Sequence, residues 1–283
     1  MTHDAGLLQA TVCLPPDRDQ HRVPLFGFQL DPIGLSEAVE RIYGWVASGE
    51  ACCRFVVTPN VDHAVLHHRN AGLRRAYQHA SLVLADGMPV VVAARLLGRA
   101  IPGRVAGSDL APALFAASQQ HGGLRVYLLG AGPGVAERAA ANITARWPAV
   151  RIVGTYSPPI GFERDPQENE TILTKIAAAR PDVLIVGLGA PKQELWVDAH
   201  RERIEAGVTL CIGATIDFLA GEKRRAPPWM RSVGLEWLHR VAGEPRRLLG
   251  RYARDAWIFP RLVWSEWVGN ARRRGHRSGS SNV

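Results

Sequence analysis

The sequence predicts an α/β protein with a Rossmann-like, mostly parallel sheet flanked by helices, followed by a basic helical appendage. Six short, almost continuously apolar runs are typical of strands buried on both faces. They alternate with helix-forming stretches, which favours parallel strands joined by right-handed crossovers. From Gly221 onward the chain holds 14 Lys and Arg against 5 Asp and Glu, whereas the preceding 220 residues hold 20 against 21. A neutral body with a basic tail is therefore expected.

The elements follow in order along the chain. Residues 1–24 form an extension without the basic start and apolar core of a signal peptide, and no apolar run approaches the roughly 20 residues of a membrane span. Residues 25–220 form the core, and Asn60 and Asn70 are placed to cap two of its helices. Residues 221–270 form the appendage, and the polar end, 271–283, is expected to be disordered. The expected strands are 54–57, 81–85, 125–130, 151–155, 182–189 and 209–215.

Asp86 is the first candidate for chemistry. Ligands of such sheets bind outside the carboxyl ends of the strands, and Asp86 directly follows the apolar run 81–85. Partial burial would raise its pKa and suit a general base. The alternative is a helix N-cap, which would leave Pro89 at the third helical position rather than the first.

Two further strand ends carry polar side chains. Thr58 and Asn60 follow the run 54–57, although Asn60 could serve only as an N-cap. Gly189 ends the run 182–189, and Lys192 and Gln193 follow in the first turn of the next helix, where a side chain can reach a ligand at the strand edge. The alternative for Lys192 and Gln193 is a solvated surface. His63, His67 and His68 resemble a metal cluster, but His63 and His67 lack a third ligand at helical spacing. We therefore interpret the three as helix-surface residues rather than a metal site.

The turn after residues 125–130 is rich in glycine. Gly130, Gly132 and Gly134 favour a diphosphate at the next helix N-terminus, and Tyr156 directly follows the expected strand 151–155. The spacing fails the dinucleotide fingerprint, so a structural turn and an NAD site remain alternatives. The sole Asp-x-Asp pair precedes the first strand, and the four cysteines lack metal-ligand spacing. We expect no metal and no cofactor, and reduced thiols indicate a cytoplasmic protein.

The appendage contains five of the eight tryptophans. Leu249, Tyr252, Ala256 and Phe259 recur at helical spacing, with arginines on other faces. A basic amphipathic helix with aromatic edges favours an anionic membrane surface. Packing against the body and nucleic-acid binding are the alternatives, and we do not expect a nucleic-acid partner.

Several stretches together resemble the WecG/TagA/CpsF glycosyltransferases, glycosyltransferase family 26, over about residues 25–265. The stretches are "TPNVDH", "LADGMPVV", "RVAGSDL", "GLGAPKQE", "GATIDFLAGEKRRAPPWM" and "GLEWLHRVAGEPRRL". The resemblance implies an inverting transferase that moves a sugar from a UDP-sugar to a polyprenyl-diphosphate-linked saccharide. N-acetylmannosamine, its uronic acid and glucose are the sugars that members of the family transfer. It also implies a role in bacterial cell-surface polysaccharide synthesis and a place on the inner face of the cell membrane.

The resemblance assigns roles to residues. Asp86 becomes the general base, with Thr58, Asn60 and Gln193 beside it, and Arg240 enters from the appendage, although His239 stands where the family usually has tyrosine. We expect Arg240, with Arg246 and Arg247 in reserve, to stabilise the leaving diphosphate. Within the quoted motifs, Arg104, Asp109 and Asp217 are further expected substrate-binding residues. An NAD-dependent oxidoreductase and a non-catalytic membrane-binding module are the competing classes. The transferred sugar, the acceptor sugar and the oligomeric state, a homo-oligomer included, stay open.

Overall fold

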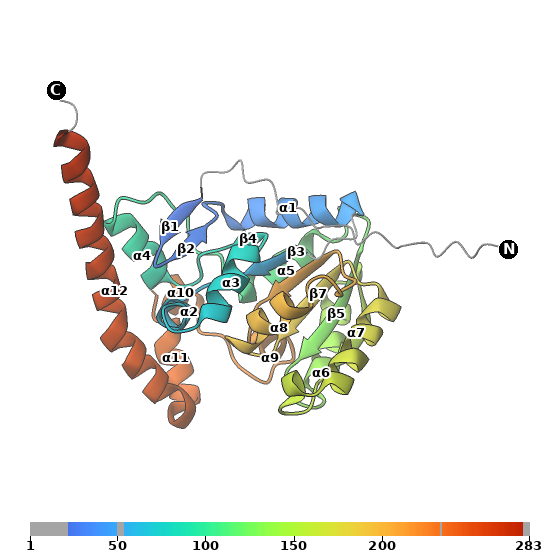
Figure 1. Cartoon of the computed structure of the whole chain (residues 1–283). Coiled ribbons are helices and arrows are strands. Elements are labelled where there is room, and N and C mark those ends of the chain that lie inside the picture. Colours follow the sequence, from blue (N-terminus) through green and yellow to red (C-terminus); the bar gives the residue numbers. More distant parts are fainter. Residues whose placement is uncertain (1–21, 50–53, 233, 280–283) are drawn as a thin grey trace.

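A computed structural model describes residues 22–49, 54–232 and 234–279, except the side chains at 228, 232, 247 and 270–279. Its centre is a six-stranded parallel sheet in the order β4-β3-β8-β7-β5-β6 (Figure 1). The strands are β3 Arg54–Val57, β4 Leu82–Val83, β5 Leu124–Gly130, β6 Val150–Tyr156, β7 Val183–Gly187 and β8 Val208–Cys211. Each strand lies within or beside one of the six apolar runs. The predicted α/β class with a parallel sheet is confirmed.

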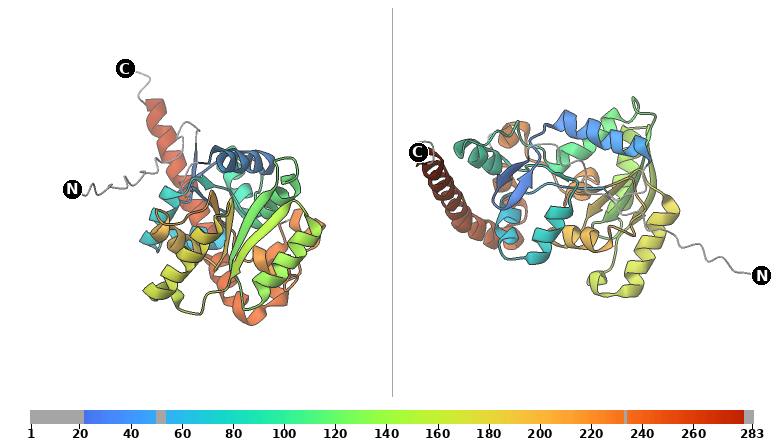
Figure 2. Two further views of the ribbon diagram at one scale, coloured as in Figure 1. Left: turned by 90° about the vertical axis from the view of Figure 1, so that its right-hand side faces the viewer. Right: turned by 45° about the horizontal axis from the view of Figure 1, so that its top comes forward.

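Both faces of the sheet are buried, which explains the continuous apolar runs. Alternate residues of a strand point to opposite faces, so Phe55 and Val57 join one core while Val56 joins the other. One face is covered by α1 Leu35–Ser48, α5 Gly107–Ala117, α6 Val135–Arg146 and α9 Thr215–Leu219. The other face is covered by α2 Val61–His67, α3 Ala71–His79, α4 Met88–Leu96, α7 Pro166–Ala179 and α8 Lys192–His200 (Figure 2). A short 3₁₀ helix, η1 Phe162–Arg164, precedes α7.

A small hairpin precedes the sheet. Strands β1 Val23–Leu25 and β2 Phe28–Leu30 pair antiparallel around Phe26 and Gly27, both with positive φ. Sequence reasoning missed it because three-residue strands give too little periodicity to recognise. The expected boundary after residue 24 falls inside β1, and residues 1–21 of the extension lie outside the described part of the chain.

The appendage consists of α10 Pro228–Ser232, α11 Glu236–Gly243 and the long α12 Pro245–Gly279. Helix α12 runs along one side of the body (Figure 1). It is held at two places: Asp62 of α2 binds Arg254 and, at 3.6 Å, Arg251. Farther along, Glu266 accepts from the backbone N–H of Phe26 at 2.9 Å and binds Arg99 at 2.6 Å.

The end of the chain was expected to be disordered. The structure instead continues α12 through residues 271–279, consistent with the high helix propensity of its arginines. Residues 280–283 lie outside the described part.

The faces of α12 differ from the simplest membrane interpretation of its sequence. Phe259, from the apolar stripe, packs on the body, and its ring lies 5.1 Å from that of Phe26, whereas Leu249 and Ala256 of the same stripe are exposed. The exposed aromatic side chains of α12 are instead Trp257, Trp264 and Trp267. The stripe thus packs partly on the body, as one alternative held, and tryptophans cover the outer surface. None of the described helices combines the length and hydrophobicity needed to cross a bilayer.

Candidate active site

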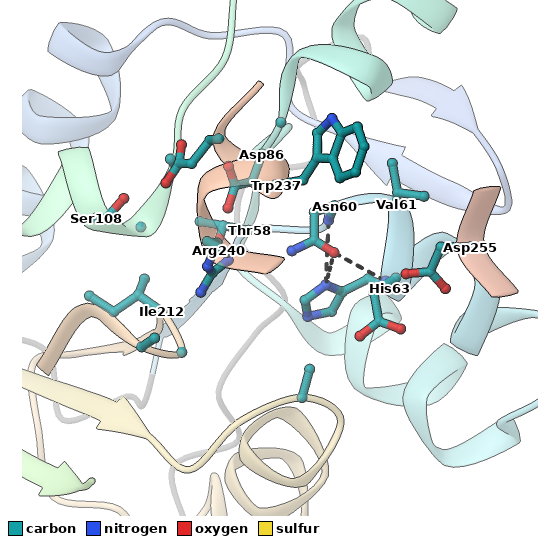
Figure 3. A pocket seen from close by; sticks show the side chains of 18 of the residues that line it. Thr58, Asn60, Val61, His63, Asp86, Ser108, Ile212, Trp237, Arg240 and Asp255 are labelled. Carbon is teal, nitrogen blue, oxygen red and sulfur yellow. Dashed lines mark hydrogen bonds between the residues drawn. The ribbon is translucent and has the colours of Figure 1, made fainter. Parts of the chain in front are cut away.

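A cavity of about 710 Å³ opens at the carboxyl edge of the sheet. Its walls come from the loops after β3, β4, β7 and β8 and from the appendage helices α11 and α12 (Figure 3). This is the edge at which ligands bind in doubly wound folds. Eight of the expected site residues line the cavity: Thr58, Asn60, Asp86, Arg104, Gly189, Gln193, Asp217 and Arg240.

Asp86 lies just beyond the buried run that contains β4. Its backbone N–H donates to the carbonyl of Pro59 at 2.9 Å, which ties the β4 and β3 loops together. Gly87, with φ of 92°, is the N-cap of α4, and Pro89 occupies the first turn, so the Asp86 carboxylate is not used as a cap. Among the described residues, no side chain forms a hydrogen bond or ion pair with it. The Asp86 carboxylate therefore lines the cavity and is available to a ligand there.

The pKa of Asp86 is raised to about 6, chiefly by burial. Nearby Arg104, Arg240 and His63 oppose this rise, whereas Glu236 adds to it. Figure 3 shows Asp86 and Arg240 on the same wall of the cavity. A carboxylate with a pKa close to neutrality is suited to accept a proton during a reaction.

Asn60 fulfils both of the roles weighed from the sequence. It is the N-cap of α2, because its Oδ1 accepts from the backbone N–H of His63 at 3.3 Å. It also lines the cavity beside Thr58, whose side chain is buried at the end of β3. Capping uses the oxygen of the amide, so the nitrogen is left for a ligand.

Gln193 is fixed on the opposite wall by its own amide. Its Oε1 accepts from the backbone N–H of Gly213 at 3.1 Å, and its Nε2 donates to Glu194 at 2.8 Å. Only 2% of Gln193 is exposed, so the surface alternative is wrong for this residue. The first of these hydrogen bonds joins the start of α8 to the loop after β8, and the second lies within α8.

Comparison with known proteins adds the family. The model of the glycosyl transferase WecG/TagA/CpsF family matches residues 23–273. The chain belongs to this family. It is also 30% identical over 231 residues to an N-acetylglucosaminyldiphosphoundecaprenol N-acetyl-beta-D-mannosaminyltransferase of Staphylococcus aureus strain MW2, across 80% of this chain and 87% of the relative. The enzyme of the same description from strain NCTC 8325 / PS 47 matches to the same extent.

Membership of the WecG/TagA/CpsF family makes this chain a glycosyltransferase. The competing oxidoreductase and non-catalytic classes are thereby set aside. The resemblance that the six motifs indicated is confirmed, and their Thr58, Asn60, Asp86, Gln193 and Arg240 meet in one cavity.

The cavity's two motif arginines have different environments. Arg240 stacks over the Phe218 ring at 5.7 Å and has no carboxylate bound to it in the described part of the chain. Arg104 is committed to Asp109 at 2.5 Å and to Glu236 at 2.9 Å. Arg240 is thus the less neutralised cation at the cavity wall.

Asp109 acts as a structural junction. Besides Arg104, it binds Arg225 at 2.8 Å and Arg231 at 3.3 Å, both from the appendage. Asp109 itself does not line the cavity, unlike Asp217, which lies 3.9 Å from Lys223. Through Arg225 and Arg231, this one carboxylate fastens the start of the appendage to α5.

The glycine-rich turn lies apart from the cavity lining. A Cβ on Gly130 would come within 2.6 Å of the Gly187 carbonyl, so close packing of β5 on β7 accounts for this glycine. Gly132 and Gly134 are exposed and, like Gly130, do not line the cavity. Tyr156 donates to Glu168 at 2.7 Å. The geometry matches the structural alternative for this turn.

The remaining expected residues point elsewhere. Lys192 binds Glu163 at 3.1 Å and lies over the Phe162 ring rather than lining the cavity. Arg246 is exposed and is not part of the cavity lining either. The side chain of Arg247 lies outside the described part of the structure.

Sequence reasoning misjudged the burial of two histidines, of which His63 lines the cavity, and missed several other residues of the site. His63 and His67 are buried, at 7% and 5% exposure, so the surface interpretation is wrong for them and holds only for His68. The sequence did hold a signal for His63: it is the third residue of the helix that Asn60 was expected to cap, a position from which a side chain can reach back to the cap. Trp237, Tyr252, Asp255 and Phe259 line the cavity from the appendage. No local pattern marks them, because docking of distant helices brings them there.

Proposed function

We propose that this glycosyltransferase moves an N-acetylhexosamine, N-acetylmannosamine first, from a UDP-sugar to a polyprenyl-diphosphate-linked saccharide. The choice of sugar and acceptor follows from two relatives, whose names give an N-acetyl-β-D-mannosaminyl group and an N-acetylglucosaminyl-diphosphoundecaprenol acceptor. The product would enter a bacterial cell-surface polysaccharide. The site for both substrates is the cavity at the carboxyl edge of the sheet.

The observation that supports this proposal most directly is the carboxylate of Asp86 in the cavity, with its raised pKa. An acceptor hydroxyl placed at its carboxylate gives up its proton to Asp86 as the oxygen attacks the anomeric carbon. The new oxygen–carbon bond forms opposite UDP while the bond to the β-phosphate oxygen breaks, and UDP leaves with that electron pair. One displacement inverts the configuration at the anomeric carbon. The pKa of about 6 keeps Asp86 ionised and ready near neutral pH.

Stabilisation of the leaving diphosphate falls to arginine in this proposal, without a metal or cofactor. Arg240 is first because it lines the cavity near Asp86 and lacks a bound carboxylate among the described residues. Arg104, which also lines the cavity, is the second candidate for this role. Thr58, Asn60 and Gln193 supply hydrogen bonds to the sugar or the phosphates, and Gly189 and Asp217 complete the binding surface.

The catalytic proposal is tested with the whole chain, a UDP-sugar panel and a short-chain lipid-diphosphate acceptor. Asp86→Asn should reduce turnover by roughly 10²–10⁴-fold, the usual contribution of a positioned base, while UDP still binds. Glu170→Gln, at an exposed carboxylate paired with Arg203, is the matched control and should retain parental turnover. Full activity of Asp86→Asn would refute the base, and inactivity of the parent with every UDP-sugar would refute the function.

We also propose that the outer surface of the appendage binds an anionic membrane, at the cytoplasmic face where the lipid acceptor resides. Four exposed tryptophans support this: Trp229, Trp257, Trp264 and Trp267. The net charge of +9 from Gly221 onward adds attraction to acidic headgroups.

Vesicle sedimentation tests the membrane proposal. The double change Trp264→Ala, Trp267→Ala should weaken binding to vesicles rich in phosphatidylglycerol at least tenfold, because two interfacial anchors are lost. Ile160→Ala is the control, since Ile160 is fully exposed on the loop after β6. Equal binding by the double variant and the parent would exclude this surface.

A further inference from the structure

A buried ion pair joins the cavity wall, at His63, to Glu194 behind it. His63, on the first turn of α2, places Nε2 3.3 Å from Oε1 of Glu194 on α8. Glu194 is completely buried, and its Oε2 has no hydrogen-bond partner among the described residues. A carboxylate in that position needs a compensating cation, and His63 is the group in contact with it.

The pair contacts the side-chain amides of two cavity residues, Asn60 and Gln193. Nδ1 of His63 lies 2.9 Å from Oδ1 of Asn60 (Figure 3). On the other side, Oε1 of Glu194 accepts from Nε2 of Gln193 at 2.8 Å. One buried pair thus spans the distance between the loop after β3 and the start of α8.

The chemistry of the partners fixes which way each amide faces. Glu194 can only accept, so the Gln193 atom facing it must be the NH₂ group. Asn60 accepts from the backbone N–H of His63, so its capping atom must be the oxygen. These contacts leave both side-chain N–H groups of Asn60 and one of Gln193 unused.

The same logic requires protons on both ring nitrogens of His63. Nε2 must donate to Glu194, and Nδ1 must donate to the Asn60 oxygen. The backbone N–H of Asn60 also approaches Nδ1, at 3.4 Å, which would need a lone pair there. The contact with Oδ1 is the shorter one and determines the proton position.

The charges around His63 agree with this assignment. Burial lowers its pKa, but the hydrogen bond and charge of Glu194, with Asp62 and Asp86, raise the pKa above its ordinary value. Tyr77 of α3, 6.4 Å away between ring centroids, has a pKa far above neutrality and remains uncharged. From α12, Arg251 and Arg254 are engaged by Asp62, and Asp255 lies at the same end of the cavity.

We propose that His63 and Glu194 are positioning residues, whose ion pair holds Asn60 and Gln193 with their N–H groups toward oxygen atoms of the sugar or diphosphate. The proposal rests on the proposed function, because that cavity is where transfer takes place. Neither residue touches the reacting atoms through this role. Both act through the two amides.

A double-mutant comparison tests the kinetic part. Glu194→Gln preserves shape and removes the charge, so kcat/KM should fall at least about tenfold as the amides lose their orientation. In an Asn60→Ala, Gln193→Ala background, the same change should cost less than about twofold. Equal losses in both backgrounds, or no loss in the parent, would overturn the proposal. If Glu194→Gln fails to fold, the neutral pair His63→Gln, Glu194→Gln takes its place.

A spectroscopic readout works even for an inactive protein, so this inference and the proposed function fail separately. In ¹⁵N NMR at pH 7.5, His63 should show two protonated ring nitrogens in the parent and fewer in Glu194→Gln. His67 is the internal control, because it is equally buried and its pKa is lowered to about 4. A neutral His63 in the parent would overturn the proposal.

Discussion

The environment of Asp86 predicts that one substitution will stabilise the protein while it removes activity. The pKa of Asp86 is about 6 in the folded chain, against an ordinary value of 3.8. Between these values the folded protein holds a proton that the unfolded chain has released. Ionisation therefore favours unfolding, and the stability of the parent falls as the pH rises from about 4 to about 6. Asp86→Asn removes this penalty.

The size of the effect follows from the pKa. A rise of about two pH units corresponds to roughly 3 kcal/mol at neutral pH, which is an upper limit. Asp86 is half-buried at the cavity wall, so solvent screens part of it. We expect Asp86→Asn to raise the free energy of unfolding by about 1–3 kcal/mol at pH 7.5 and by almost nothing at pH 4.

Urea unfolding of both proteins between pH 4 and pH 8 measures this difference. Glu170→Gln is the control and should follow the parent within about 0.5 kcal/mol, as exposed substitutions do. Two outcomes would refute the reasoning. One is an Asp86→Asn variant no more stable than the parent at pH 7.5, and the other is a difference that persists undiminished at pH 4.

Three further predictions concern Arg240, Asp62 and Gly130. Arg240→Ala should lower kcat/KM for transfer by roughly 10²–10³-fold, whereas Lys192→Ala, at a side chain engaged by Glu163, should stay within twofold in the same assay. Asp62→Asn loosens α12 by removing the partner of two arginines, so limited proteolysis should cut α12 several times faster than in the parent. Gly130→Ala should cost roughly 2–4 kcal/mol in urea unfolding, since φ is 116° and the added Cβ meets the Gly187 carbonyl.

Periodicity and strand-end chemistry predicted the sheet and much of the cavity. The six apolar runs located every strand of the main sheet, and the edge rule brought Asp86, Asn60 and Gln193 together. Sequence reasoning overvalued the glycine turn, because glycine serves close strand packing at Gly130 as readily as it serves phosphate. It undervalued His63, because burial of a polar residue depends on a partner 131 positions away.

The placement of α12 was beyond local reasoning for a related reason. Its apolar stripe indicated a helix that buries one face, but a stripe does not say whether that face meets lipid or protein. Phe259 packs against Phe26, and Glu266 reaches the backbone of that same residue, contacts separated by more than 230 positions. Tertiary docking decided between the alternatives.

The first turn of α2 joins these separate observations. Three consecutive residues there have three tasks: Val61 lines the cavity, Asp62 binds the arginines of α12, and His63 holds Asn60 and Glu194. Because helix backbone is stiff over one turn, a displacement of α12 that pulls on Asp62 is transmitted to the neighbouring side chains. The helix that carries the exposed tryptophans is therefore mechanically connected to the amide beside the proposed base. The proposed membrane-binding surface and the cavity are thus linked through a single helical turn.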